Sequence, residues 1–404
     1  MRKAFFVVFA FILQSCGIEE IGGDGKNDAL PPVWNNPSSG NISEGLRTVL
    51  YCTGFEYPKG YDWKSDPEKG SVKCSLIVYA DKVPVMKVPV GDSYLVSSDP
   101  DMHRMIEGHL YTDFPVSGET VIKKDGLELL RYSGEESLCG MTVKGENVYT
   151  LGNNRTGRGF ALRKNGKVIV GRDEGHVFER LQEFGDSLSF AFIEPVTTQG
   201  GVIERYYHVI DGKVSQVAVR DDVRKVWDVI VHNGKVCCLA TLTGVSDPVV
   251  MIGNALYTIS IPSLCQVLDL RLFSTGDKIC VEGLILVMGV APMSLIWSEF
   301  KVIHAFQLAS IHSVMTDGDG IFCLSLPMAE NQTAQIYKGG EVYDLPHGYV
   351  PMGSVPMAMA DGIIYSALSS TKGDYPVIWK DGQLDTLNIN GFLTSVSAYK
   401  ASVR

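Results

Sequence analysis

Four polar side chains of types that could do chemistry recur at one position of a repeated unit. When the repeats are aligned on the glycine of a turn, Arg180, Asp228 and His312 stand six residues before it, and Asp269 joins them if its longer turn carries one extra residue. Carboxylates beside an imidazole could act as acid and base or ligate a metal ion, and the whole row could hold a cation, a water cluster or a polar ligand. The same row also fits a solvated channel lining, because polar side chains there need no ligand.

The sequence lacks the motifs of several common enzyme classes. It contains no His-Glu-x-x-His, no Gly-x-Ser-x-Gly, no phosphate-binding loop and no paired Cys-x-x-Cys, so we expect no cofactor. The segment Asp317-Gly318-Asp319-Gly320 is similar to part of a calcium loop, but Met328 stands where an EF-hand needs its bidentate glutamate. We therefore interpret that segment as a turn.

Tyr61 and Trp63 are a second candidate site, of a different kind. They lie among charged residues in a long connection, residues 58–71, which has no counterpart in the other repeats. An exposed aromatic pair on a loop could contact a carbohydrate or a protein partner. The alternative is that the loop packs on its own repeat.

These residues belong to a repeat with a period of 40 to 46 residues. A turn follows an apolar or aromatic strand in each copy. Its clearest forms are Lys124-Asp125-Gly126, Lys164-Asn165-Gly166, Ile210-Asp211-Gly212, Lys338-Gly339-Gly340 and Lys380-Asp381-Gly382, with weaker copies at Asp81, Gly253 and Glu299. Asn-Gly and Asp-Gly are preferred in two-residue hairpin turns because both positions need a positive φ. The period is typical of the four-stranded blades of a β-propeller.

A second marker supports the same architecture. Apolar residues open a short strand once per repeat, at Leu50, Leu110, Val148, Leu188, Val236, Ile279, Ile321 and Ile363. The sequence thus predicts an all-β protein, a β-propeller of eight four-stranded blades, with seven as the alternative if a unit near Leu188 or Leu256 is misread. Residues 393–399 are similar to the first strand of a unit and residues 46–52 to the second. We therefore expect the N- and C-terminal strands to pair in one blade and close the ring.

The N-terminus resembles the signal of a bacterial lipoprotein. Two cations precede an apolar run at residues 4–13, and the sequence Leu-Gln-Ser-Cys that follows ends at Cys16. The resemblance implies that residues 1–15 are a signal peptide, and that Cys16 carries a lipid anchor to the cell envelope, with the outer membrane expected. Glu19 and Glu20 are similar to the acidic stretch of surface-exported lipoproteins of the Bacteroides group. These two residues do not decide whether the protein faces the periplasm or the cell exterior. The alternative for the apolar run is an ordinary N-terminal strand.

Residues 16–45 differ in composition from both neighbouring segments. They are rich in Gly, Asn, Pro, Ser and acidic residues, which bury too little apolar surface to offset the entropy of ordering. We expect a flexible tether at 16–45 and a single propeller domain at 46–404. The net charge of −10 argues against a nucleic-acid partner or an anionic lipid surface.

Eight further cysteines follow the lipidation site. Their even number in an exported chain makes disulfides one interpretation. The repeat register favours packing, because Cys237 and Cys280 share one strand position while Cys52, Cys238 and Cys323 share the next. The neighbours Cys237 and Cys238 should point to opposite faces of their sheet.

The repeats resemble bacterial propellers in general and match no well-marked subfamily. We expect a cell-envelope lipoprotein that binds a glycan, peptide or protein partner through its propeller without catalysis. The alternative is a propeller enzyme, a hydrolase or lyase acting on extracellular polysaccharide, with Asp228, Asp269 and His312 as acid, base or metal ligands. The fold alone does not choose between them.

Overall fold

The computed structural model describes most of the chain from residue 46 onward. The described ranges are 46–63, 73–92, 103–116, 118–155, 159–177, 181–184, 187–198, 201–217, 222–289, 291–318, 320–329, 332–353, 355–372 and 375–402. The expected signal peptide, Cys16 and the tether lie outside them. Within them, no helix is long and apolar enough to cross a membrane.

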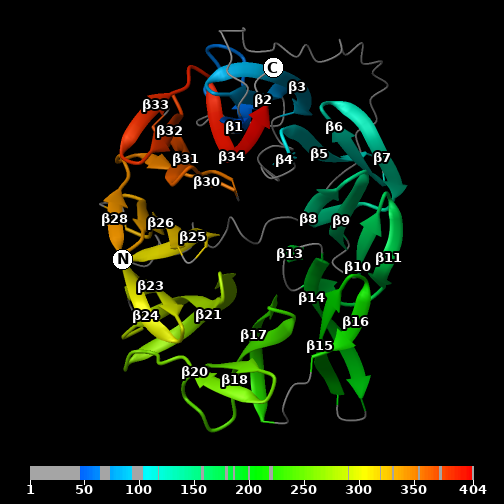
Figure 1. Cartoon of the computed structure of the whole chain (residues 1–404), viewed down its shortest axis with the longest axis vertical. Coiled ribbons are helices and arrows are strands. Elements are labelled where there is room, and N and C mark those ends of the chain that lie inside the picture. The colour runs from blue at the N-terminus through cyan, green and yellow to red at the C-terminus, as the bar shows by residue number, and fades with distance from the viewer. Residues whose placement is uncertain are drawn as a thin grey trace.

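The strands form eight antiparallel sheets, which surround a common centre as the blades of a β-propeller (Figure 1). Blade 1 consists of β4 (His103–Ile106), β5 (His109–Val116), β6 (Glu119–Lys124) and β7 (Leu127–Ser133). Blade 2 consists of β8 (Glu136–Lys144), β9 (Asn147–Asn154), β10 (Phe160–Lys164) and β11 (Lys167–Arg172). Blade 3 consists of β12 (His176–Val177), β13 (Gln182–Phe184), β14 (Ser187–Thr198), β15 (Gly201–Ile210) and β16 (Lys213–Gln216). Blade 4 consists of β17 (Val223–His232), β18 (Lys235–Leu242), β19 (Val249–Ile252) and β20 (Ala255–Thr258). Blade 5 consists of β21 (Cys265–Thr275), β22 (Lys278–Val287), β23 (Ala291–Ser298) and β24 (Lys301–Gln307). Blade 6 consists of β25 (Ala309–Asp317), β26 (Gly320–Pro327), β27 (Gln335–Lys338) and β28 (Glu341–Asp344).

The last two sheets complete the ring. Blade 7 is β29 (Tyr349–Val350), β30 (Met357–Ala360), β31 (Ile363–Ser370), β32 (Val377–Lys380) and β33 (Gln383–Thr386), and the closing blade is β34 (Gly391–Ser402), β1 (Leu46–Glu56), β2 (Lys73–Ala80) and β3 (Val83–Asp92). Both suspected degenerate units are complete blades, since Leu188 lies in β14 and Leu256 in β20. The eight-blade prediction is confirmed and the seven-blade alternative is wrong.

The closing blade joins the two ends of the described chain. Strand β34 pairs with β1 over the whole length of β1, from Leu46 opposite Ser402 to Glu56 opposite Gly391 (Figure 1). A Cβ atom at Gly54 would collide with the carbonyl oxygen of Phe392 on the facing strand. A small residue is therefore needed where the pairing shifts register, and the expected closure by terminal strands is confirmed.

The two sequence markers are linked by a hydrogen bond in several blades. Asp125, in the turn between the third and fourth strands of blade 1, accepts the amide of Leu110, which opens the second strand, at 2.9 Å. Asp211 and Leu188 make the same bond at 2.9 Å in blade 3. The acidic residue has φ near 50° in both turns. It therefore supports the left-handed turn and also satisfies an amide of the neighbouring strand.

The antiparallel order gives the ring two distinct faces. Turns between the first and second strands and between the third and fourth strands lie on one face, which we call the turn face. Connections between the second and third strands and from blade to blade lie on the other, which we call the loop face. Strand β1 starts at the turn face, because its far end leads into the connection to β2 on the loop face.

The core lies between blades, where the sheets pack face to face. The second strands are buried on both sides, which is why they form nearly continuous apolar runs such as Val236 to Ala240. Cys237 packs in the cluster toward blade 5 and Cys238 in the cluster toward blade 3. No disulfide joins the eight cysteines of the described residues, and the five that share the two register positions are buried. The packing interpretation is therefore confirmed for these five, and the disulfide alternative is wrong. Burial raises the pKa of the Cys238 thiol to about 12.

Candidate functional site

The row of polar residues lies on the innermost strands of consecutive blades. Asp228 is on β17, Asp269 on β21 and His312 on β25, in blades 4, 5 and 6 (Figure 1). Arg180 falls outside the described residues. The repeat alignment thus identified inner-strand positions correctly for the three residues that can be placed.

The innermost strands of these blades carry a β-bulge next to the row. The extra residue is Trp227 in β17, Leu268 in β21 and His312 in β25. Asp228 and Asp269 follow the bulge, whereas His312 occupies it. The alignment is offset by one residue because the reference glycine is the second residue of the turn in blade 4 and the first in blade 6. A bulge redirects side chains, so His312 is not equivalent to Asp228 and Asp269, which follow the bulge and each accept the amide of the next residue.

Asp228 is a buried carboxylate bonded to the main chain of two blades. One oxygen accepts the amide of Val229 at 2.7 Å, and the other accepts the amide of Leu272, in blade 5, at 2.6 Å. Burial raises the pKa of Asp228 to about 6, while the two amides oppose the rise and the charge of nearby Asp269 adds to it. Both oxygens are occupied by amides, so this side chain links blades 4 and 5.

Asp269 and His312 have different environments from Asp228 and from each other. The Asp269 side chain is 52% exposed and lies 3.3 Å from Nε of Arg271. The ring of His312 donates from Nε2 to the carbonyl of Gly353 at 2.9 Å, in the connection that precedes β30. Its bond therefore joins blade 6 to blade 7, whereas Asp269 remains open to solvent.

A lysine that the sequence reasoning missed lies beside this row. Lys225, on β17, places Nζ 3.1 Å from the ring centroid of Trp227, whose Nε1 donates to Thr241 at 2.8 Å. Burial lowers the pKa of Lys225, and the charge of Asp269 acts against that decrease. Lys225 and Trp227 are two residues apart on one strand, a spacing that places side chains on the same face, and this spacing could have indicated the pair from the sequence. Lys225, Asp269 and Arg271 are exposed charged groups on these inner strands, and Arg224 on β17 is exposed as well.

Tyr61 and Trp63 pack on the closing blade. Trp63 stacks on Tyr57 with centroids 5.9 Å apart and also meets Phe392 at 5.1 Å. The side-chain amide of Asn390 donates to the carbonyl of Tyr61 at 3.0 Å. Both rings are half-buried. These contacts hold the start of the long connection on its own blade, and a partner contact through its remaining surface stays a prediction.

A buried network of hydroxyl groups joins the closing blade to blade 1. Nε2 of His103, on β4, lies 2.7 Å from the hydroxyls of both Thr53 and Thr394. The hydroxyl of Ser395 lies 2.5 Å from that of Thr53. The network satisfies polar groups at the point where the ring closes, which gives it a structural function. No short-range sequence pattern predicts it, because it joins three segments that are distant in the chain.

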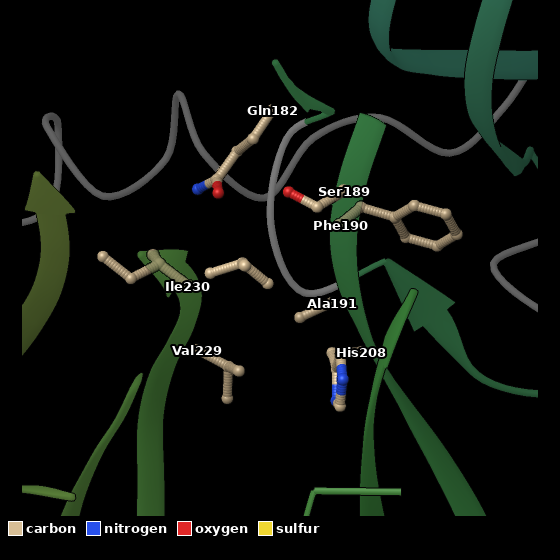
Figure 2. Close-up of a pocket in the computed structure, with 8 residues that line it drawn as sticks. Gln182, Ser189, Phe190, Ala191, His208, Val229 and Ile230 are labelled. Carbon is tan, nitrogen blue, oxygen red and sulfur yellow. The ribbon is translucent and has the colours of Figure 1, made fainter. Parts of the chain in front are cut away.

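A small recess lies between blades 3 and 4 (Figure 2). Its lining includes Ser189, Ala191 and His208 from blade 3, with Val229 and Ile230 from blade 4. Burial lowers the pKa of His208. The recess has no room for a water molecule, so it is a local packing gap between the sheets.

No metal-ligand cluster is formed by histidine, cysteine, aspartate and glutamate side chains within the described ranges. No family model matches the chain, and no curated protein matches it. Solved structures similar to it include the β-propeller domain of the Trilobed protease from Pyrococcus furiosus, with 12% identity, 80% of this chain and 98% of that chain covered, and a TM-score of 0.42. Dihydro-heme d1 dehydrogenase NirN in complex with DHE has 10% identity, 90% and 77% coverage, and a TM-score of 0.48. TolB from Acinetobacter baumannii has 10% identity, 86% and 82% coverage, and a TM-score of 0.31. Likenesses at this level extend no activity to this chain.

Proposed function

We propose that this protein is a lipid-anchored propeller of the cell envelope that binds a glycan, peptide or protein partner without chemical conversion. Its parts are a signal peptide at residues 1–15, a tether from Cys16 to residue 45, and a binding body from residue 46 onward. The sequence pattern ending at Cys16 supports the anchor.

One observation carries the binding role. The two groups of the row best suited to acid and base chemistry, Asp228 and His312, are bonded to main-chain groups of the next blade. A general acid or base must reach the proton that it transfers, and these bonds direct both groups into blade contacts. The exposed groups Lys225, Asp269 and Arg271 offer both signs of charge to a polar ligand, which favours recognition over catalysis.

Glycan binding with simultaneous product analysis tests this role. The protein is screened on a glycan array, and the same glycans are incubated with it and examined for new reducing ends or unsaturated products. We expect retention without cleavage. A Lys225→Ala/Arg271→Ala variant should lose retention, while Arg131→Ala, which changes an exposed arginine on the outer strand β7, should keep it. New products would support the polysaccharide-acting enzyme, and binding unaffected by the first variant would place the ligand elsewhere.

Metabolic labelling tests the anchor independently. Labelled palmitate should enter the wild-type chain and should not enter Cys16→Ala. Equal labelling of both chains would contradict the lipoprotein assignment. Protease treatment of intact cells then distinguishes a surface-exposed body from a periplasmic one.

A further inference from the structure

Strand β17 of blade 4 is the most irregular of the described inner strands. In β8, β21, β25 and β34 the pairing with the neighbouring strand shifts register once, whereas in β17 it shifts twice. The extra residues of β17 are Arg224 and Trp227. The bulge at Trp227 corresponds to those at Leu268 and His312, but the bulge at Arg224 has no counterpart in the described inner strands. Bulges are common beside binding sites because they redirect side chains. The repeat itself therefore does not explain the bulge at Arg224.

This bulge exposes two cations in succession. Val223 lies opposite Leu242 and Lys225 opposite Thr241, so Arg224 has no residue opposite it. In a regular strand, successive side chains point to opposite faces of the sheet. Here the side chains of Arg224 and Lys225 are both exposed. They lie near the start of β17, toward the loop face, because the turn that follows β17 belongs to the turn face (Figure 1). One end of this inner strand therefore presents two neighbouring positive charges to solvent.

The indole ring of Trp227 holds the ammonium group of Lys225. Nζ of Lys225 lies 3.1 Å from the ring centroid, and Nε1 of Trp227 donates to the hydroxyl of Thr241 at 2.8 Å. The indole also packs against the apolar cluster between blades 4 and 5. A cation over an aromatic ring is attracted by the electron-rich face of the ring. Lys225 therefore has less conformational freedom to lose on binding a ligand than an unrestrained surface lysine.

The carboxylates of the neighbouring blade are paired with another cation, Arg271. The Asp269 side chain lies 3.3 Å from Nε of Arg271 and accepts a main-chain amide at 3.0 Å. Oε1 of Glu282 lies 3.8 Å from a terminal nitrogen of the same arginine. Within the described ranges, neither Arg224 nor Lys225 forms an ion pair with a carboxylate. Their N–H donors are therefore available to a negatively charged ligand.

We propose that Arg224 and Lys225 bind the carboxylate of an acidic glycan. The guanidinium group of Arg224 can donate two parallel hydrogen bonds to a carboxylate, and the ammonium group of Lys225 can donate a third. Such charge-assisted bonds are stronger than bonds between neutral groups. The proposal rests on the binding function proposed above and names the class of its ligand, a glycan that contains uronic acid.

The surrounding charges favour a glycan over an acidic peptide. Asp222 immediately precedes β17, and the charge of Asp269 acts on Lys225. An acidic peptide carries carboxylates on neighbouring residues, and Asp222 and Asp269 would repel those that do not meet the two cations. A uronic acid carries one carboxylate on each sugar ring, and its hydroxyl groups can donate to acidic side chains. One carboxylate among several hydroxyl groups therefore matches two cations that lie beside acidic groups.

Calorimetric titration with matched pairs of oligosaccharides tests the proposal. The full chain is titrated with oligosaccharides of galacturonic, mannuronic and glucuronic acid. Each is compared with its carboxyl-reduced form, which keeps the sugar ring and loses the charge. We expect at least one acidic oligosaccharide to bind, and its carboxyl-reduced form to bind roughly tenfold or more weakly. Binding should also weaken as salt is added, because the two cations are exposed to solvent.

Variants of the two cations locate the binding position. Arg224→Gln/Lys225→Gln should reduce the affinity for the acidic oligosaccharide by roughly tenfold or more. Arg224→Lys keeps the charge but not the two parallel bonds, and should reduce the affinity less than the double change does. Lys167→Gln/Lys213→Gln removes two exposed cations from the outer strands β11 and β16 and should bind as the wild type does. All these variants should melt at the wild-type temperature, because the changed side chains are exposed.

Each alternative outcome gives a decision. Equal binding of an acidic oligosaccharide and its carboxyl-reduced form would overturn the proposal and leave glycan binding intact. Unchanged affinity in Arg224→Gln/Lys225→Gln would also overturn it. An oligoglutamate peptide that binds more tightly than every acidic oligosaccharide, and loses its affinity in the same variant, would assign the two cations to an acidic peptide instead. If no acidic oligosaccharide binds, the proposal fails, and retention of neutral glycans on the array then shows whether the general binding function fails with it.

Discussion

The ion pair between Glu136, on β8, and Arg163, on β10, provides a quantitative test of how blade 2 is held together beside blade 1. Oε1 of Glu136 accepts from Nε of Arg163 at 3.0 Å and from its terminal nitrogen at 2.7 Å. The side chains are only 7% and 14% exposed, and the guanidinium lies 4.3 Å from the ring centroid of Tyr132 on the outer strand of blade 1. Removal of the arginine would leave a carboxylate buried without its counter-charge.

The expected cost follows from that burial. Removing one partner of a buried pair costs about 3–5 kcal/mol, because the remaining charge stays out of water without compensation. Unfolding entropy of roughly 2.1 cal/mol/K per residue over about 360 residues gives ~0.75 kcal/mol/K, so Arg163→Met should lower the melting temperature by about 4–7 °C. Salt should change this difference little, since the pair is shielded from solvent.

Scanning calorimetry with two matched variants checks the reasoning. Arg131→Met removes an arginine that pairs with Glu119 and Glu128 but is 42% exposed, and we expect a loss under 1 kcal/mol. Glu136→Gln/Arg163→Met removes both charges and should recover much of the loss. If Arg163→Met melts within about 1 °C of the wild type, the buried pair does not stabilise blade 2 as argued.

Three further predictions concern closure, ionisation and the repeated turn. Deletion of residues 396–404 removes the part of β34 that pairs with residues 46–52. The melting temperature should therefore fall by on the order of 10 °C or more, or the protein should aggregate. Deletion of residues 17–43 is the control, and equal melting temperatures of the two deletion variants would contradict closure of the ring by β34. The folded state holds the proton of Asp228 more tightly than the unfolded state, so its protonated form stabilises the fold below about pH 4 and this contribution is lost as the pH rises toward about 6. The melting temperature of Asp228→Asn minus that of the wild type should therefore increase from pH 4 to pH 7, and a difference that does not vary with pH would refute the burial argument. Asp211→Ala removes the hydrogen-bond acceptor for Leu188 and Ser187 and should lower the free energy of unfolding by about 1–3 kcal/mol, measured by denaturant titration. Lys213→Ala, at an exposed neighbouring position, should lower it by less than about 0.5 kcal/mol.

The architecture could be predicted because its signals are local and repeated. A left-handed turn favours Asp, Asn or Gly, and the strand that faces it opens with an apolar residue, as in Asp125 and Leu110. The sequence shows both residues, although the hydrogen bond between them is visible only in the fold. Repetition over eight units makes such a weak signal decisive.

The site was less predictable because its contacts join distant segments. The alignment found the inner-strand positions of Asp228 and His312, but their partners, Leu272 and Gly353, lie more than 40 residues away. Bulges then changed the direction of neighbouring side chains, and no residue type marks a bulge reliably. Arg224 was equally hidden, since it occupies a further bulge on β17.

The pairing of β1 with β34 also sets the order in which the protein can mature. Strand β1 is made before the other seven blades, but the strand that it must pair with is completed only by residues 391–402. Seven blades can assemble from neighbouring segments as they emerge, whereas the closing blade has to wait for the end of the chain with an open edge on β1. Contacts of such long sequence separation form slowly because loop closure precedes their gain. We therefore expect the last step of folding to be the slow one, and chaperones that cover open strand edges to act on this chain until β34 has been made.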